Sequence, residues 1–256
     1  MYNIYAMHIS LAAEPLFHFG IFTVTNSLLA SHLGSLLLII VAFVIHNKLK
    51  NSPSFLLQNI LEIVVDYMDN LAVSVGGEKA RKFLPIVLTI FLYILVSNWL
   101  GLLPGFGSIG LTVLKDGEHE FVPLLRGATA DLNTTLALAL IAFFSIQFYG
   151  VSENKLSYFK KFFNLESPVA FFAGILELIS EFSKIISFSF RLFGNVFAGE
   201  VLLAVVTALI PIIVPLPFLG LEIFVGLIQA YVFSILTLVF INLGTQVHGE
   251  GVEHGN

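Results

Sequence analysis

The sequence predicts an all-α integral membrane protein, with about five membrane-crossing helices and one amphipathic helix at the membrane interface. Hydrophobic residues make up 57% of the chain and charged residues only 11%, against about 25% charged in soluble domains. Five long segments are apolar enough, and close enough to the roughly 20 residues that a membrane core requires, to be spans. The 256 residues are therefore expected to form a single transmembrane domain.

The chain begins with a mixed aromatic and polar stretch, residues 1–27, which we expect to lie outside the membrane. Residues 28–47 form the first span, which is apolar and is followed by Lys48. Residues 52–77 differ, because three acids recur there at spacings that place them on one helical face: Glu62, Asp66 and Asp69. Three acids are costly inside a membrane, so this segment is predicted to be the interfacial amphipathic helix.

The later elements follow from the same criteria. In chain order they are span 2 (83–103), a Gly-rich polar outer loop (104–129), span 3 (130–150), a long tilted helix (168–210), a final helix (218–246) and a cytoplasmic tail (247–256). The long helix and the final helix are expected to form a hairpin.

The positions of the basic residues predict the topology, because cytoplasmic loops are enriched in Lys and Arg. Most of the 12 basic residues fall on one side of the predicted spans: Lys48, Lys50, Lys79, Arg81, Lys82, Lys155, Lys160 and Lys161. Only Lys115 and Arg126 fall on the other side. The N-terminus is therefore predicted outside and the C-terminus in the cytoplasm.

The long segment could be one helix or two, because Gly194-Asn195 is a turn signal. As one helix it would extend roughly 64 Å, about twice the membrane core, and would have to be steeply tilted. Polar residues form a stripe within roughly 80° of the helix circumference, and this stripe continues through the Gly-Asn pair: Glu177, Ser180, Lys184, Ser187, Arg191 and Asn195. A turn would leave that continuity unexplained, so a single helix is favoured.

Arg191 supports a functional interpretation of this polar stripe. A seam between packed helices accounts for the serines and the asparagine. An arginine within a span cannot lose its proton, and it is retained where it faces water or a carboxylate. Glu200 lies on the opposite side of the same helix. Glu222 and Gln229 share one face of the final helix and could line a water-filled pathway for protons. Glu222 alone also fits an interfacial position near a helix start.

Four segments resemble subunit a of bacterial F-type ATP synthases, in order and at family spacing over most of the chain from about residue 20. They are NWLGLLP from Asn98, ADLNTT from Ala130, RLFGNVFAGE from Arg191 and QAYVF from Gln229. The resemblance implies a stator subunit without a catalytic site of its own, in the bacterial inner membrane. Its implied partners are a ring of c subunits, the subunit b stalk and the remaining ATP synthase subunits.

The resemblance also implies two offset half-channels that carry protons to and from carboxylates on the rotating ring. Arg191 would face those carboxylates and separate the two paths. The outer half-channel would include Asn98, Asn195, Glu200, Glu222 and Gln229. The cytoplasmic half-channel would include Glu177, Ser180, Lys184 and Ser187.

Two of these positions depart from patterns within the family. Some members carry His where this chain has Glu222, and mitochondrial members carry His where it has Glu200. Two carboxylates would then share the relay, and one would titrate high if the two were close enough for like-charge coupling.

Other classes of protein fit the sequence less well. A secondary transporter that binds an anionic substrate through Arg191 would show internal repeats, and none is evident. A membrane redox enzyme would need His within its spans, but the seven His residues lie in loops, tails or near span ends. Cysteine is absent, which excludes disulfides and thiolate chemistry. No cofactor or metal is expected. No nucleic-acid partner is expected either, because no basic patch forms outside short loops.

Overall fold

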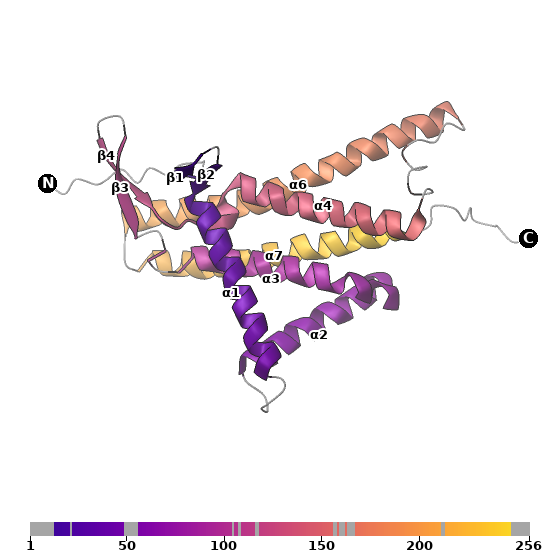
Figure 1. The fold of residues 1–256 in the computed structure, drawn as a ribbon, viewed down its shortest axis with the longest axis horizontal. Coiled ribbons are helices and arrows are strands. Elements are labelled where there is room, and N and C mark those ends of the chain that lie inside the picture. The colour runs from indigo at the N-terminus through magenta and orange to yellow at the C-terminus, as the bar shows by residue number, and fades with distance from the viewer. Residues whose placement is uncertain are drawn as a thin grey trace, which may run out of the picture.

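A computed structural model describes residues 13–20, 22–48, 56–103, 105–106, 109–115, 118–155, 158, 162, 167–210 and 213–246. Its long helices are α1 (Asn26–Lys48), α2 (Leu56–Gly76), α3 (Leu84–Gly101), α4 (Leu132–Asn154), α6 (Pro168–Leu209) and α7 (Pro215–Thr245). Two short 3₁₀ helices, η1 (Glu78–Phe83) and η2 (Ala128–Ala130), precede α3 and α4. Figure 1 shows α3, α4, α6 and α7 along the long axis of the molecule, with α1 running across them.

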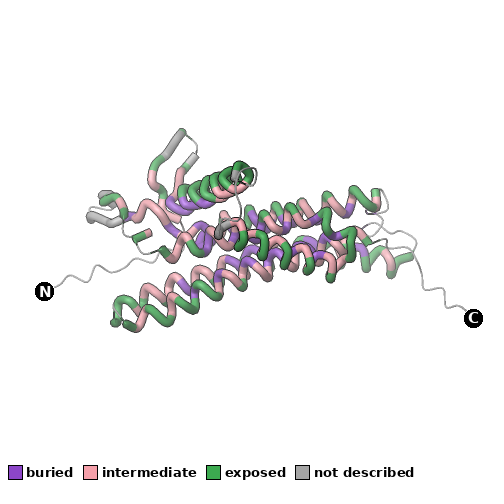
Figure 2. The backbone as a smooth tube through the Cα atoms, turned by 90° about the horizontal axis from the view of Figure 1, so that it is seen from below, coloured by how far each residue is buried: buried purple, intermediate pink, exposed green. Residues whose placement is uncertain are grey.

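The predicted fold class is confirmed. Five helical stretches are long and apolar enough to cross a membrane: α1, η1 with α3, α4, α6 and α7. Large apolar side chains such as Phe43, Phe148 and Phe172 are more than 60% exposed, and Figure 2 shows exposed positions along the outer faces of the helices. Such surfaces fit a hydrocarbon environment, because soluble proteins rarely expose contiguous apolar patches of this extent.

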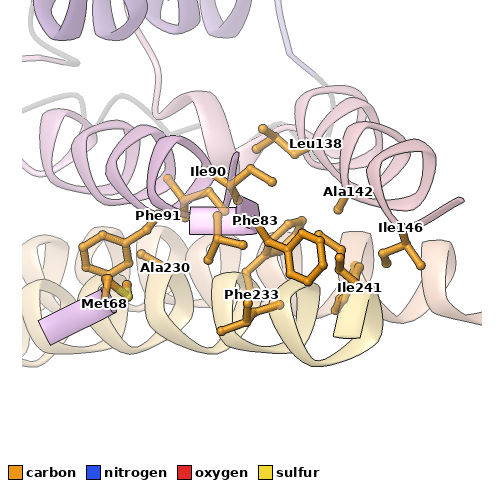
Figure 3. Close-up of a cluster of buried hydrophobic side chains, with 14 of the residues drawn as sticks. Met68, Phe83, Ile90, Phe91, Leu138, Ala142, Ile146, Ala230, Phe233 and Ile241 are labelled. Carbon is orange, nitrogen blue, oxygen red and sulfur yellow. The ribbon is translucent and has the colours of Figure 1, made fainter. Parts of the chain in front are cut away.

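The core lies where the lengthwise helices meet. Phe91 of α3, Leu138 of α4 and Phe233 of α7 are buried there, together with Met68 of α2. Figure 3 shows these side chains converging from the separate helices. Ring stacking between Phe188 of α6 and Phe233, with centroids 4.8 Å apart, joins α6 to this core. The polar residues of α6 are therefore carried on a helix that is packed along one side.

The long segment is one continuous helix, as the polar stripe indicated. Ser167 caps the start of α6, since its Oγ accepts a hydrogen bond from the Ala170 backbone N–H at 3.1 Å. Helix α6 continues through Gly194 and Asn195 to Leu209. Helix α7 then begins at Pro215, three residues before the predicted start, because proline is tolerated in the first turn of a helix.

Two β-hairpins lie where the sequence predicted only irregular outer segments. Strands β1 (Pro15–Phe19) and β2 (Phe22–Thr25) pair antiparallel, as do β3 (Gly110–Lys115) and β4 (Glu118–Pro123). The sequence between β3 and β4 is Asp116-Gly117, a dipeptide typical of tight hairpins. These hairpins leave the all-α class unchanged, since all the long elements are helices.

Helix α2 has the two-sided character predicted for an interfacial helix. Met68 and Ala72 are buried against the core, whereas Glu62 and Asp66 are exposed. Asp69 pairs with Arg81 of η1 at 3.1 Å, which fastens the end of α2 to the start of the next span. The position of α2 at a membrane surface stays a prediction.

Candidate functional site

The polar stripe borders the packed face of α6. Residues buried along α6 recur at seven-residue spacing, as in Gly174, Glu181 and Phe188, which is typical of a helix packed lengthwise against neighbours. In the stripe, Glu177, Lys184 and Arg191 are half-buried, and Ser180, Ser187 and Asn195 are exposed. The stripe therefore lies between the buried interior and the open side of α6.

Arg191 is held by neighbours on its own helix. Its Nη2 donates to Ser187 Oγ at 3.1 Å, and Asn195 Nδ2 donates to the Arg191 carbonyl oxygen at 2.8 Å. Within the described residues no carboxylate pairs with this guanidinium. The positive charge of Arg191 thus stands beside neutral hydrogen-bonding groups.

Lys184, the other cation of the stripe, has a different environment. Its Nζ lies 2.9 Å from Oε1 of Glu181, a residue that is only 3% exposed. The ammonium group also lies 4.5 Å from the centre of the Phe240 ring on α7. Lys184 is therefore tied to the packed side of α6.

Asn98 connects three elements near the C-terminal end of α3. Its side-chain amide donates to the Gly226 carbonyl of α7 at 2.8 Å, and its oxygen accepts from Thr129 Oγ1 of η2 at 2.6 Å. Asn98 is 5% exposed, so these bonds satisfy a buried polar group. Gln229 lies one turn beyond Gly226 on α7 and is half-buried.

Glu222 lies at the crossing of α6 and α7. It is 8% exposed, and its carboxylate faces the backbone of Gly199 so closely that a β-carbon at that position would collide with it. Gly199 thus provides the space that brings an acidic group from α7 against the surface of α6.

Glu200 is bound by a residue that the sequence analysis assigned to a loop. Nε of Arg126 lies 3.2 Å from one carboxylate oxygen of Glu200, and Nη2 lies 3.1 Å from the other. Only 7% of the Arg126 side chain is exposed, although the topology argument treated it as an outer-loop cation. Arg126 precedes η2, which packs on α6, and this connection turns the side chain inward.

The two glutamates therefore occupy unlike environments. Glu200 faces a permanent positive charge, whereas Glu222 faces a glycine backbone. Within the described residues no contact joins Glu200 to Glu222, so the like-charge coupling considered from the sequence gains no support there. Sequence reasoning also missed Arg126, Glu181 and Gly199 as site residues. Arg126 meets Glu200 and Gly199 meets Glu222 from distant parts of the chain, so helical periodicity gives no signal for these two. Glu181 lies three residues before Lys184, and that spacing was a local signal that could have found it.

A buried charge network on apolar helices defines an ion-handling membrane protein, since charged groups inside membranes are retained for ion or substrate pathways. The profile of the ATP synthase A chain family matches residues 28–242. The chain belongs to this family.

Curated relatives support the same assignment. The chain is 35% identical over 219 residues to ATP synthase subunit a of Sulfurihydrogenibium sp. strain YO3AOP1, covering 84% of this chain and 96% of the relative. It is 40% identical over 216 residues to ATP synthase subunit a of Gloeobacter violaceus, covering 84% and 81%. A third relative, ATP synthase subunit a of Geotalea daltonii, is 36% identical over 208 residues, covering 80% and 81%.

Proposed function

We propose that this chain is the stator half of a rotary proton motor, in which Arg191 separates two offset proton paths. As a member of the ATP synthase A chain family, the protein is a proton-translocating component of the membrane sector of an ATP synthase. The observation that carries the finer proposal is the charge of Arg191, whose guanidinium donates to Ser187 on α6 and has no carboxylate partner in the described chain.

The physical argument begins with the membrane potential, which is worth about 2.3 kcal/mol per charge per 100 mV. A continuous proton path across the membrane would dissipate this energy as a leak. A fixed guanidinium between two partial paths repels a free hydronium ion but attracts a carboxylate on a moving partner. Proton transfer is thereby coupled to movement of that partner, for which we propose a ring of c subunits.

The two paths would approach Arg191 from opposite ends of the molecule. The outer path would use Asn98, Asn195, Glu200, Glu222 and Gln229. The cytoplasmic path would use Glu177, Ser180, Lys184 and Ser187. Exposure of Ser180, Ser187 and Asn195 on the open side of α6 supports this proposal, because a partner or water can reach them there.

The remaining assignments rest on the family resemblance and on the distribution of Lys and Arg. The subunit would contact the c ring through α6 and α7 and would be held by the subunit b stalk. It would lie in the bacterial inner membrane, with the N-terminus outside and the C-terminus in the cytoplasm.

The proposal is tested by substituting Arg191 within the intact ATP synthase. Arg191→Ala should abolish ATP synthesis and ATP-driven proton pumping, with a possible rise in passive proton leak, while the complex still assembles. Arg191→Lys should also be poor, because an ammonium group lacks the delocalised, planar charge of guanidinium. Arg81→Ala, which removes an exposed cation outside the stripe, is the control. Near-normal synthesis by the Lys variant would contradict the proposal.

A further inference from the structure

Two buried or half-buried cations lie on either side of Arg191 in the described residues, and each is paired with a carboxylate. Arg126 pairs with Glu200 at 3.1 Å, and Lys184 pairs with Glu181 at 2.9 Å. Arg191 donates instead to the neutral hydroxyl of Ser187. Of these three cations, Arg191 is the one whose charge is not compensated within the described part of the chain.

The carboxylate that compensates Lys184 is held from a second helix. Gln147 of α4 donates through Nε2 to Glu181 Oε2 at 3.0 Å. The oxygen of the same amide accepts a hydrogen bond from the Tyr158 hydroxyl at 2.7 Å. Because Glu181 is 3% exposed and bound from two sides, its carboxylate has a fixed position beside the ammonium group.

The pair also fixes the direction of the Lys184 side chain. Lys184 and Arg191 are seven residues apart on nearly the same line of α6, about 10 Å along the helix axis. The Phe240 ring draws the ammonium group towards α7, and the pair with Glu181 holds it on the packed side of α6. Without the carboxylate, a second positive charge would stand on the stripe two turns from Arg191.

We propose that Glu181 is a positioning residue of the proton pathway, which neutralises Lys184 and so leaves Arg191 as the uncompensated cation of the stripe. This inference rests on the proposed function. Two unit charges about 10 Å apart repel one another by an amount that corresponds to roughly tenfold in an equilibrium constant, at the effective dielectric of a protein interior. An uncompensated Lys184 would repel protons on the cytoplasmic path and compete with Arg191 for an acidic partner.

The test uses three variants of the intact ATP synthase in inverted vesicles. Glu181→Gln keeps the shape and removes the charge, so ATP-driven pumping should fall roughly tenfold. Gln147→Met removes the hydrogen bonds to Glu181 and Tyr158 but leaves the ion pair, so pumping should fall clearly less than in Glu181→Gln. The double variant Glu181→Gln with Gln147→Glu moves the negative charge from α6 to the facing position on α4, with the hydrogen bond between the two side chains reversed in direction, so pumping should recover.

Pumping is divided by the amount of intact complex on a native gel, so that lost assembly is not counted as lost coupling. Wild-type pumping by Glu181→Gln overturns the proposal. So does a Gln147→Met variant as weak as Glu181→Gln, because loss of the hydrogen bonds alone would then account for the whole effect. If Glu181→Gln gives no intact complex, the double variant carries the test, and an assembled double variant that does not pump overturns the inference.

Arg191→Ala, measured in parallel, separates this inference from the proposed function. If Arg191→Ala pumps normally, the proposed function itself is wrong. If Arg191→Ala does not pump and Glu181→Gln pumps normally, only the role of Glu181 is wrong.

Discussion

The carboxylate of Glu222 on α7 occupies the space that a side chain at residue 199 of α6 would fill. Gly199 is buried in the helix that carries Arg191, and a β-carbon there would overlap all three carboxyl atoms of Glu222. The Glu222 carboxylate thereby contacts α6 at Gly199, which follows Arg191 by eight residues. The packing of α7 on α6 and the position of the Glu222 carboxylate depend on the same glycine.

Gly199→Ala should therefore displace Glu222 and decrease ATP-driven proton pumping by roughly tenfold or more, because small misplacements of reacting groups have large effects on rate. The measurement is dye quenching in inverted vesicles, normalised to assembled complex. Gly220→Ala is the matched control, since a β-carbon there meets no atom within 4 Å. Equal pumping by the two variants would mean that the position of Glu222 is unimportant.

Glu222→Gln should lose most ATP-driven pumping while the complex still assembles. The substitution keeps the shape of the side chain but removes a group that can take up and release a proton. Glu62→Gln makes the same chemical change at an exposed position of α2 and should leave pumping within about twofold of wild type, as for most surface substitutions. Normal pumping by Glu222→Gln would refute a role for Glu222 in the outer path.

The Arg126–Glu200 pair should respond unequally to loss of either partner. The Arg126 side chain is 7% exposed and that of Glu200 is 37% exposed. Glu200→Gln removes a carboxylate from a buried guanidinium that cannot lose its proton, and the loss of unfolding free energy should approach the roughly 3–5 kcal/mol of a fully buried pair as its upper bound.

Arg126→Gln leaves a carboxylate that water can reach, so it should decrease the free energy of unfolding by less than Glu200→Gln does. Thermal unfolding midpoints of the two detergent-purified complexes measure this difference. A larger decrease for Arg126→Gln than for Glu200→Gln would contradict the burial argument.

Asn98→Leu should destabilise the contact between α3 and α7. The change removes partners from the Gly226 carbonyl and the Thr129 hydroxyl, and an unsatisfied buried polar group costs about 1–3 kcal/mol. Trp99→Phe removes one hydrogen bond, to the Ile223 carbonyl at 3.1 Å, from a residue that is 41% exposed. Trp99→Phe should therefore decrease the free energy of unfolding by less than Asn98→Leu does. Resistance to unfolding by detergent, measured for both variants, checks this order.

The helical class was predictable from composition, and the continuity of α6 was predictable from periodicity. Both properties are local, because a membrane requires each spanning backbone to satisfy its own hydrogen bonds within a helix. The stripe from Glu177 to Asn195 was visible for the same reason, since residues three and four apart share one face of any helix. The hairpin of β3 and β4 was missed although Asp116-Gly117 gave a signal for it.

The partners across the site were not predictable from local pattern. Sequence alone established that Arg191, Glu200 and Glu222 belong to an apolar, membrane-embedded chain and that Arg191 lies on the polar stripe. Only the tertiary structure decided that Arg126 pairs with Glu200, that Gln147 of α4 binds Glu181, and that Gly199 admits Glu222. Helical periodicity fixes the direction of a side chain around its own axis, whereas the group that it meets depends on the angle and depth at which separate helices pack.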